Sequence, residues 1–411
     1  MKNKSILLGT MITAGSAIGG GMFSLPIVSS GMWFSLAVLS FLLIWYISYL
    51  SALMILEANL HYPPGSSFDT FVKDILGKGW SIFLGICVAF MLYILLYAYC
   101  SAFGNMAIHV WENSLGKVAA NSSTQGLLGL GLGILFSAAI WVSTLFVGRL
   151  ASILVIGMGI SFVIATSGVI ANISLTELFS ASPPEASYLS YVWAGLPYYI
   201  TSFGFASVVP SLYKHYGKDV NKIKQSLLYG SIIALLTYII WLAISFGIIP
   251  RHEFVGINET GGNVGDLVSA MEQKMGSSSI QSALNLFSYF AIISSFLGVG
   301  LSLFDYIADL FDFGNDKKGR FITTCISFLP PALASYFFPH GFIAAIGYAG
   351  FVLYLAFFFI PFFMIWKLRT SRKKGDYQLS GGKVLLGFVF VISTVTAICK
   401  VLTMFDLLPV L

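Results

Sequence analysis

Eleven stretches of this chain are long and apolar enough to cross a lipid bilayer as a helix, which takes about 20 residues. They lie at 6–30, 34–60, 80–111, 126–147, 150–173, 191–213, 223–249, 280–313, 321–338, 342–366 and 384–408. Only 9% of the 411 residues are charged, against roughly a quarter in soluble domains. The sequence therefore predicts an all-α polytopic membrane protein embedded in the lipid bilayer, with no room for a sizeable soluble domain.

Lysine and arginine residues gather in alternate loops between these spans. If the N-terminus, with Lys2 and Lys4, is cytoplasmic, 18 of the 22 lysines and arginines lie on the cytoplasmic side. Such a bias sets the orientation of most membrane proteins. We therefore predict a cytoplasmic N-terminus and a C-terminus outside. The net charge of +5 comes from these loops, so it does not indicate a nucleic-acid partner.

Two spans are interrupted by small residues that precede a proline. The first, 6–30, contains Gly15, Gly19, Gly20 and Gly21 before Pro26, and the second, 191–213, contains Ser202 and Gly204 before Pro210. A helix can break inside a bilayer only where its freed backbone groups face a protein cavity. Two broken helices, five spans apart and opposite in direction, are typical of inverted repeats in transporters. We expect repeats at 1–173 and 191–366, with 384–411 as an accessory span.

Other interpretations of these features remain. Glycine and proline are common in membrane helices, and small residues also allow helices to pack closely. The segment 250–279, with several glycines, is expected to form short helices over an outer vestibule, or else a plain surface loop.

Two other classes of membrane protein fit the sequence less well. The five histidines are far apart, and the four cysteines show no metal-ligand spacing, so we expect no enzyme and no cofactor. A channel needs a continuous polar lining, whereas the polar residues here cluster at one depth. A carrier is the class that the pattern favours.

Several ordered motifs carry a family resemblance over nearly the whole length. They are Gly19-Gly20-Gly21-Met22-Phe23-Ser24-Leu25-Pro26, Leu56-Glu57-Ala58-Asn59-Leu60, Gly65-Ser66-Ser67-Phe68-Asp69-Thr70, Tyr93-Ile94-Leu95-Leu96-Tyr97-Ala98-Tyr99, Ser202-Phe203-Gly204-Phe205, Val209-Pro210-Ser211, Ser294-Ser295-Phe296-Leu297-Gly298 and Leu303-Phe304-Asp305-Tyr306-Ile307-Ala308-Asp309-Leu310-Phe311. With them the chain resembles the bacterial aromatic amino acid permeases, and among these the tryptophan-specific permeases.

The resemblance implies a leucine-transporter-like fold: a 5+5 inverted repeat with broken helices 1 and 6, plus an eleventh helix. It also implies a monomer in the bacterial inner membrane. There it would import an aromatic amino acid, driven by a cation gradient of Na⁺ or H⁺. Tryptophan is the expected substrate, and a carrier selective for tyrosine or phenylalanine is the alternative.

An amino acid zwitterion needs N–H donors for its carboxylate and carbonyl acceptors for its ammonium, and a broken helix offers both. We assign the carboxylate to backbone donors around Ala17, Gly19, Gly20 and Gly21. The ammonium is assigned to carbonyls near Ser16, Ser202, Phe203 and Phe205. The glycines could instead serve only close helix packing.

The aromatic ring of the substrate needs an apolar slot with few polar groups. Phe203 and Phe205 flank the second break. Tyr93 and Tyr99 lie on the third span and face inward by the resemblance, with the Tyr99 hydroxyl reaching the substrate carboxylate. Packing or lipid contact is the alternative role for each ring.

A coupling ion is also implied by the resemblance. In leucine-transporter-like folds, Na⁺ bridges carbonyls of the first span and two hydroxyls of the eighth. Here those positions are the carbonyls of Gly15, Ile18 and Ala291 and the hydroxyls of Ser294 and Ser295. Hydroxyls bonded back to their own helix are the alternative.

The chain departs from its relatives at two positions. Met158 stands where proton-coupled relatives carry a lysine, and Ala206 where relatives carry a histidine. A buried proton carrier must be ionisable, so these residues weaken the case for H⁺ coupling and strengthen that for Na⁺. They also leave the selectivity among aromatic substrates open.

Acidic side chains near the inner ends of two spans are candidates for gating. Glu57 could bond the freed backbone of the sixth span, carry a proton, or be structural. Asp305 and Asp309 share one face of the eighth span and are expected to pair with loop cations as a gate or brace. Lys400, in the last span, is expected to snorkel or to pair within the bundle.

Overall fold

A computed structural model describes residues 5–115, 121–170, 173–180, 188–371 and 377–411, excepting the side chains at 111–115 and 180, and no strand occurs among them. The long helices are α3 (Trp33–Asn59), α5 (Lys78–Leu115), α6 (Ser122–Val142), α7 (Thr144–Val169), α11 (Val220–Ile248), α14 (Ser278–Phe311), α15 (Lys317–Phe337) and α18 (Gly382–Met404). Shorter helices are α4 (Phe68–Leu76), α8 (Leu175–Ser180), α12 (Glu253–Glu259) and α13 (Val264–Gln273). The tenth predicted run, 342–366, forms α16 (Phe342–Tyr354) and α17 (Ile360–Thr370), joined by a π-helical turn, Leu355–Phe359.

The remaining two spans are interrupted. The first contains α1 (Ile6–Ala17), the 3₁₀ turn Gly20–Phe23 and α2 (Ser24–Ser29). The other contains α9 (Val192–Ser202), the 3₁₀ turn Phe205–Val208 and α10 (Val209–Tyr216). Both breaks fall where the small residues and prolines predicted them.

Within the described residues, nine helices are long and apolar enough to cross a membrane, and the bent pair α1–α2 makes ten. This is one fewer than expected from the sequence. The remaining predicted span, 321–338, is helical as α15 but is not among the ten. Arg320 and the pair Pro330–Pro331 lower its mean hydropathy. The chain is therefore a multi-pass membrane protein in which α15 is the most polar of the long helices.

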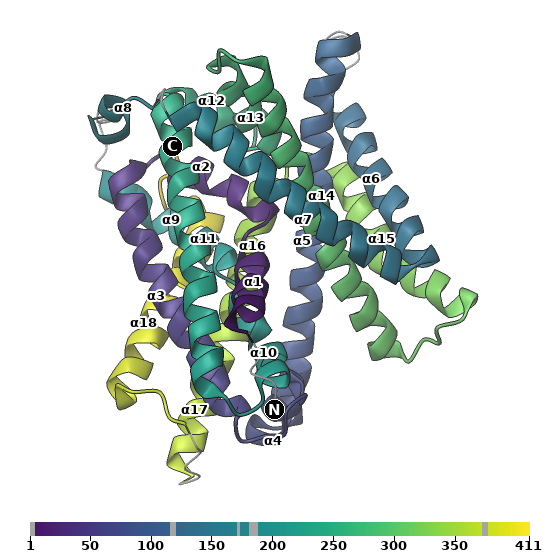
Figure 1. Ribbon diagram of the computed structural model, residues 1–411, viewed down its shortest axis with the longest axis vertical. Helices are drawn as coiled ribbons and strands as arrows, with labels where there is room; N and C mark the ends of the chain where they lie inside the picture. The colour runs from purple at the N-terminus through teal and green to yellow at the C-terminus, as the bar shows by residue number, and fades with distance from the viewer. Residues whose placement is uncertain (1–4, 116–120, 171–172, 181–187, 372–376) are drawn as a thin grey trace.

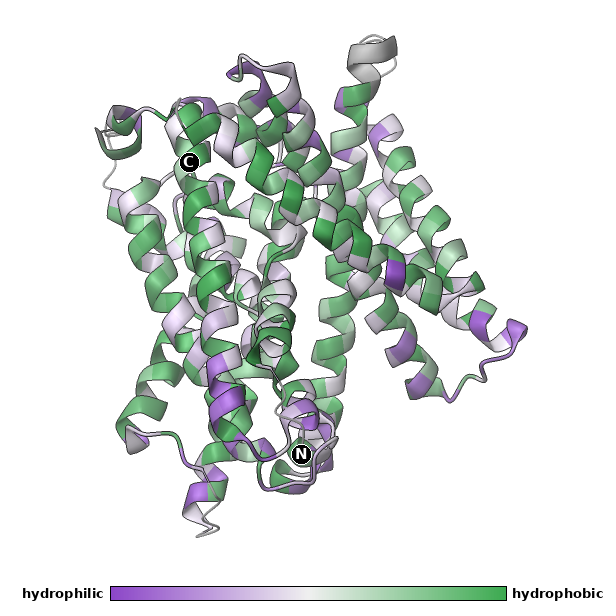
Figure 2. Cartoon of the chain, in the orientation of Figure 1, coloured by the Kyte–Doolittle hydropathy of each residue, from purple (hydrophilic) through white to green (hydrophobic). Residues whose placement is uncertain are grey.

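The two ends of the bundle differ in what covers them (Figure 1). We call the end that holds α4 and the start of α1 the N-terminal face, and the end that holds α12, α13 and the C-terminus the opposite face (Figure 1). Hydrophilic residues gather toward both ends, with a largely apolar band between them (Figure 2). As predicted, the segment 250–279 forms short helices, α12 and α13.

Capping side chains fix where several helices begin. Ser67 accepts a hydrogen bond from the Thr70 N–H at the start of α4. Asp219 does the same for Lys222 in α11, and Asp316 for Gly319 in α15. Each satisfies a backbone donor that the first turn of a helix leaves free. These caps therefore fix the residues at which α4, α11 and α15 begin.

Candidate functional site

The first break exposes the backbone of a glycine-rich segment. Helix α1 ends at Ala17, and Ile18 (φ −76°, ψ 117°) and Gly19 (φ −172°, ψ −164°) are extended. Helical turns resume at Gly20, and the two parts of the span meet at a bend of 49°. The last carbonyls of α1 and the N–H groups that follow have no partner within a regular helix, so they are available to other groups.

The second break lies in a straighter span with aromatic residues. Helix α9 ends at Ser202, and Phe203 (φ −101°, ψ 33°) and Gly204 (φ −72°, ψ 18°) leave helical geometry. Turns resume at Phe205, and Pro210 is the second residue of α10. A proline has no N–H to donate and is tolerated at a helix start.

The two breaks lie against each other and run in opposite directions. Helix α2 packs against α9, and α1 packs against the turn Phe205–Val208. From α11, the Tyr238 hydroxyl donates to the carbonyl of Ala17 at 2.6 Å and contacts the carbonyl of Ser202 at 2.9 Å. The last carbonyls of α1 and α9 therefore converge on one atom.

Sequence reasoning missed Tyr238. It lies in an apolar run with no glycine or proline near it, and it is fully buried. Its contacts join positions 221 and 36 residues away. The one feature of the sequence that could have indicated a role for Tyr238 is a single tyrosine hydroxyl within a long apolar span, and this is weak evidence.

Glycines of the first break touch α5 and α14 closely. The Gly20 N–H donates to Ser295 Oγ at 2.8 Å. A Cβ at Gly20 would lie 2.8 Å from Ile292 Cδ1 and 3.0 Å from Tyr99 Cε1, and one at Gly19 would lie 2.6 Å from Ser295 Oγ. The Tyr99 hydroxyl interacts with Ser295 in turn. No side chain fits at Gly20 without displacing these neighbours.

The second break is packed with rings. Phe203 and Phe205 are buried. The Phe203 ring meets Tyr238 edge-on at 5.3 Å and Phe41 at 6.2 Å between ring centres. A Cβ at Gly204 would lie 2.7 Å from Leu353 Cδ1. This side of the junction is apolar and closed.

Other predicted site residues lie elsewhere or have other partners. The Tyr93 hydroxyl donates to the carbonyl of Ile326 at 2.8 Å, which ties α5 to α15 instead of reaching the breaks. Ser16 is exposed and donates to the Thr13 carbonyl of its own helix. Gly21 is half-buried. The Ser202 hydroxyl donates to the Tyr198 carbonyl, so its carbonyl is the group that meets the junction.

The two serine hydroxyls expected to bind the ion from α14 have protein partners in this conformation. Ser294 is buried and donates to the Ala291 carbonyl at 3.3 Å, whereas Ser295 accepts from Gly20. On α1, Gly15 is exposed and Ile18 half-buried. Ser295 is thus the member of this set that a hydrogen bond joins to the first break.

Polar side chains are exposed along the N-terminal half of the spans around the junction. They are Ser16 on α1, Ser207 and Ser211 at and after the second break, and Ser302, Asp305 and Asp309 on α14. Exposure of such groups to lipid would be costly, so they indicate an aqueous vestibule on this face. Asp305 and Asp309 line a cavity of about 260 Å³ together with Arg320.

The predicted ion pairs of these aspartates with loop cations are not found among the described residues. The Arg320 guanidinium instead donates to the carbonyls of Ile140 at 2.6 Å and Trp141 at 2.9 Å. Those carbonyls end α6, where a cation is stabilised by the helix dipole. The expected pairing of these aspartates with loop cations therefore stays a prediction, and Arg320 shares their cavity.

Glu57 does not bond the sixth span, as had been one expectation. It is buried and accepts from Arg369 Nε at 2.9 Å and Nη2 at 2.6 Å, and from the Leu379 N–H at 2.8 Å. This two-point pair joins α3, α17 and the segment that leads to α18. Near it, burial raises the pKa of Tyr377 to about 12.

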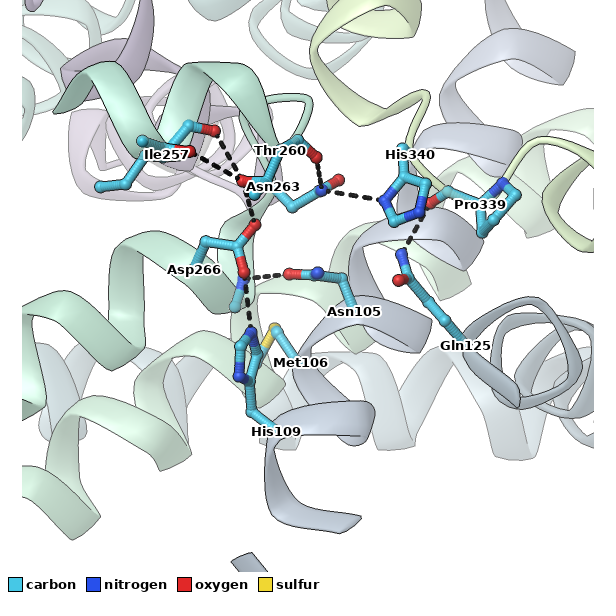
Figure 3. Close-up of polar contacts among 12 residues, drawn as sticks. Asn105, Met106, His109, Gln125, Ile257, Thr260, Asn263, Asp266, Pro339 and His340 are labelled. Atoms are coloured by element: carbon cyan, nitrogen blue, oxygen red, sulfur yellow. Dashed lines mark hydrogen bonds and ion pairs between the residues drawn. The ribbon is translucent and has the colours of Figure 1, made fainter. Parts of the chain in front are cut away.

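A polar network closes the opposite face (Figure 3). His109 Nε2 and Asp266 Oδ1 lie 2.9 Å apart, and the Gly265 N–H donates to Asn105 Oδ1 at 2.7 Å. Asn263 meets His340 at 3.3 Å. We call these six residues the opposite-face network. It fastens α13 and the turn before α16 onto the end of α5.

A second contact holds the end of α2. Arg251 donates to the carbonyls of Ser30 at 3.1 Å and Gly31 at 2.8 Å, and its guanidinium lies over the rings of Tyr188 and Tyr191. Burial lowers the pKa of Arg251, and burial raises the pKa of Glu272 on α13. The opposite face is thus closed by interactions that span several elements.

Known proteins match this chain along nearly its whole length. Residues 2–400 match the model of the tryptophan/tyrosine permease family. The tryptophan-specific transport protein of Shigella flexneri is 42% identical over 409 residues, which is 99% of this chain and 97% of that protein. The tyrosine permease of Enterobacter agglomerans is 38% identical over 98% of this chain and 97% of that protein.

A third relative, the low affinity tryptophan permease of Escherichia coli K12, is 38% identical over 99% of this chain and 98% of that protein. The matches run from end to end, through both breaks and the spans that surround them. The chain therefore belongs to the tryptophan/tyrosine permease family.

Proposed function

We propose that this chain is a secondary carrier that imports an aromatic amino acid, with L-tryptophan as the first substrate to test. One observation carries the proposal: the broken ends of two antiparallel spans meet, so that carbonyls and N–H groups face one small region. The names of the tryptophan-transporting relatives support the choice of substrate. Tyrosine is the second candidate, because a tyrosine permease is nearly as similar.

The substrate's charged groups have complementary partners at the junction. The carbonyls of Ala17 and Ser202 end two helices, whose C-terminal dipoles favour a cation such as the ammonium. The carboxylate would bind N–H groups of Gly19, Gly20 and Gly21, and at Gly20 it would replace the Ser295 hydroxyl as acceptor. Tyr99, which lies against Gly20, would contact the carboxylate or the ring.

Alternating access would proceed by moving the half-helices. The N-terminal halves expose polar groups, while α2 and most of α9 are buried. We infer a carrier open to the N-terminal face, which the lysine and arginine distribution assigns to the cytoplasm. The repeats 1–173 and 191–366 would rock against each other, with α18 as an accessory span and with Glu57, Asp305 and Asp309 in the gate on this face.

Coupling to Na⁺ is the variant that we propose first. Its ligands would be the carbonyls of Gly15, Ile18 and Ala291 and the hydroxyls of Ser294 and Ser295. The hydrogen bond from Gly20 to Ser295 supports this site, because it places a predicted ligand beside the first break. Met158 and Ala206, which are buried and cannot titrate, favour Na⁺ over H⁺.

Uptake by the purified protein in proteoliposomes tests the function. Radiolabelled tryptophan is supplied with an inward Na⁺ gradient, an inward H⁺ gradient, or neither. We expect accumulation above equilibrium under the Na⁺ gradient, with unlabelled tyrosine and phenylalanine competing more weakly than tryptophan. Equal uptake under all three conditions, without exchange against preloaded tryptophan, would contradict a carrier.

A further inference from the structure

The Tyr238 hydroxyl occupies a place where two helices present their C-terminal ends. Helix α1 has 12 residues and α9 has 11, and the last carbonyl of each accepts or contacts the same oxygen, at 2.6 and 2.9 Å. Each helix end carries roughly half a negative charge. The region attracts a cation, yet the group that the chain supplies there is neutral.

The spacing of the two carbonyls suits an ammonium nitrogen. Because the oxygens of Ala17 and Ser202 both lie within 2.9 Å of one atom, they are separated by at most two hydrogen-bond lengths. An ammonium nitrogen that donates to both carbonyls also requires their oxygens to lie within two hydrogen-bond lengths of each other, since N–H···O distances are about 2.7–3.2 Å. The second lone pair of each carbonyl remains open to such a donor.

The ring of Tyr238 is held independently of its hydroxyl. It is fully buried and packs against Phe203 at 5.3 Å and Phe41 at 6.3 Å between ring centres. These contacts come from the second break and from α3, and they would survive removal of the hydroxyl. The oxygen atom is therefore the group that joins Tyr238 to the carbonyls of Ala17 and Ser202.

We propose that Tyr238 is a positioning residue for the substrate's ammonium group: its hydroxyl holds the carbonyls of Ala17 and Ser202 at the separation that one ammonium can bridge. This inference rests on the proposed function. Holding the two half-helices together in the empty carrier lowers the ordering cost of binding. When the substrate enters, its ammonium donates to the same two carbonyls, and the hydroxyl oxygen keeps two lone pairs with which to accept from it.

The test compares ligands with and without the ammonium. Uptake of L-tryptophan and its inhibition by indole-3-propionate, which carries hydrogen in place of the ammonium, are measured in proteoliposomes of the wild type and Tyr238→Phe. We expect the KM for tryptophan to rise roughly tenfold. The inhibition constant of indole-3-propionate stays within about twofold, and its retention shows that the variant site is folded.

Tyr213→Phe is the matched control, because Tyr213 is also fully buried and its hydroxyl donates to a carbonyl, that of Tyr62, at 2.9 Å. It should change neither constant. Equal weakening of both ligands by Tyr238→Phe would overturn the inference, and so would an unchanged or lower KM for tryptophan. Absence of tryptophan uptake by the folded wild type would overturn the proposed function itself.

Discussion

The two halves of the broken spans are unequally enclosed, although both spans contain a break. On the opposite face, α2 is buried at five of its six positions and α9 at eight of its eleven. On the N-terminal face, α1 leaves Leu7, Leu8 and Met11 exposed. Only its side with Gly9 and Thr13 is buried, where α1 packs on α11.

The difference follows from what crosses each face. The opposite-face network ties α13 and the turn before α16 to α5, and Arg251 separately ties the end of α2 to the turn after α11. On the N-terminal face, the strong pair Glu57–Arg369 joins α3 to α17 and does not hold α1. The opposite face is thus fastened across several elements, whereas α1 on the N-terminal face is held to α10 through Tyr216, whose hydroxyl accepts from the Gly9 N–H at 3.1 Å and donates to the Ser5 carbonyl at 2.9 Å. This asymmetry is the one that the proposed carrier, open to the N-terminal face, requires.

The largest expected effect comes from filling the first break. Gly20→Leu would collide with Ile292 and Tyr99, because even a Cβ lies at 2.8 and 3.0 Å. We expect tryptophan uptake to be abolished while the protein remains inserted in the membrane. Gly131→Ala is the control, since a Cβ there meets nothing within 4 Å. Wild-type uptake or tryptophan binding by Gly20→Leu would count against the glycine assignment.

The next effect tests whether the opposite face is fastened by its network. Asp266→Asn removes the charge that faces His109 at 2.9 Å, so the face should open more often. The labelling is done in a chain whose four native cysteines are replaced by serine and which carries Ile27→Cys, because Ile27 is only 1% exposed in this state. An impermeant maleimide should label this cysteine roughly fivefold faster with Asp266→Asn than without it. That factor corresponds to stabilising the open state by about 1 kcal/mol.

Glu253→Gln is the matched control for this labelling. It breaks the pair with Lys274 at 2.7 Å on the same cap, but both side chains are about a third exposed, and exposed pairs contribute little. It should leave the labelling rate unchanged. Equal acceleration by both variants, or by neither, would show that the network does not set the closed state.

A smaller effect is expected for the dependence of uptake on Na⁺, which tests the proposed ion site beside the first break. Ser294→Ala together with Ser295→Ala removes two proposed Na⁺ ligands and the acceptor of the Gly20 N–H. We expect the Na⁺ concentration for half-maximal uptake to rise about tenfold, as when about 1.4 kcal/mol is lost. Unchanged activation by Na⁺ would remove this ion site from the account.

The smallest effect concerns the accessory span. Lys400 on α18 is buried, and its ammonium lies over the rings of Tyr348 at 4.8 Å and Tyr198 at 5.3 Å. No carboxylate lies within 4 Å of it among the described residues. A buried cation without a counter-ion costs free energy, so Lys400→Met should leave uptake intact and raise Tm by a few degrees. A clear fall in Tm would reveal a stabilising role for the ammonium.

The breaks were predictable because glycine and proline act locally on a helix. Their consequence in an apolar span can be derived from the cost of bare peptide groups in lipid. The length of the apolar runs located most spans, and it placed α12 and α13 between spans. It misplaced the boundary between 126–147 and 150–173, because α6 ends at Val142 and α7 begins at Thr144.

Side-chain directions and long-range partners were harder to predict. Side chains six residues apart on a helix point in directions that differ by about 120°. Tyr93 and Tyr99 therefore could not both face the breaks, and the Tyr93 hydroxyl donates to the Ile326 carbonyl instead. Tyr238, Arg369 and Asp266 have partners more than 30 residues away, which no local pattern records. Asp305 and Asp309 were expected to pair with loop cations, whereas the Arg320 guanidinium beside them donates to the carbonyl end of α6.

The measurement that tests the central claim most directly is an experimental structure of the protein with L-tryptophan bound. The account predicts the ammonium nitrogen within about 2.7–3.2 Å of the carbonyl oxygens of both Ala17 and Ser202, and the carboxylate against the Gly19–Gly21 backbone. Tryptophan bound away from both breaks, or a continuous helix through either of them, would contradict it.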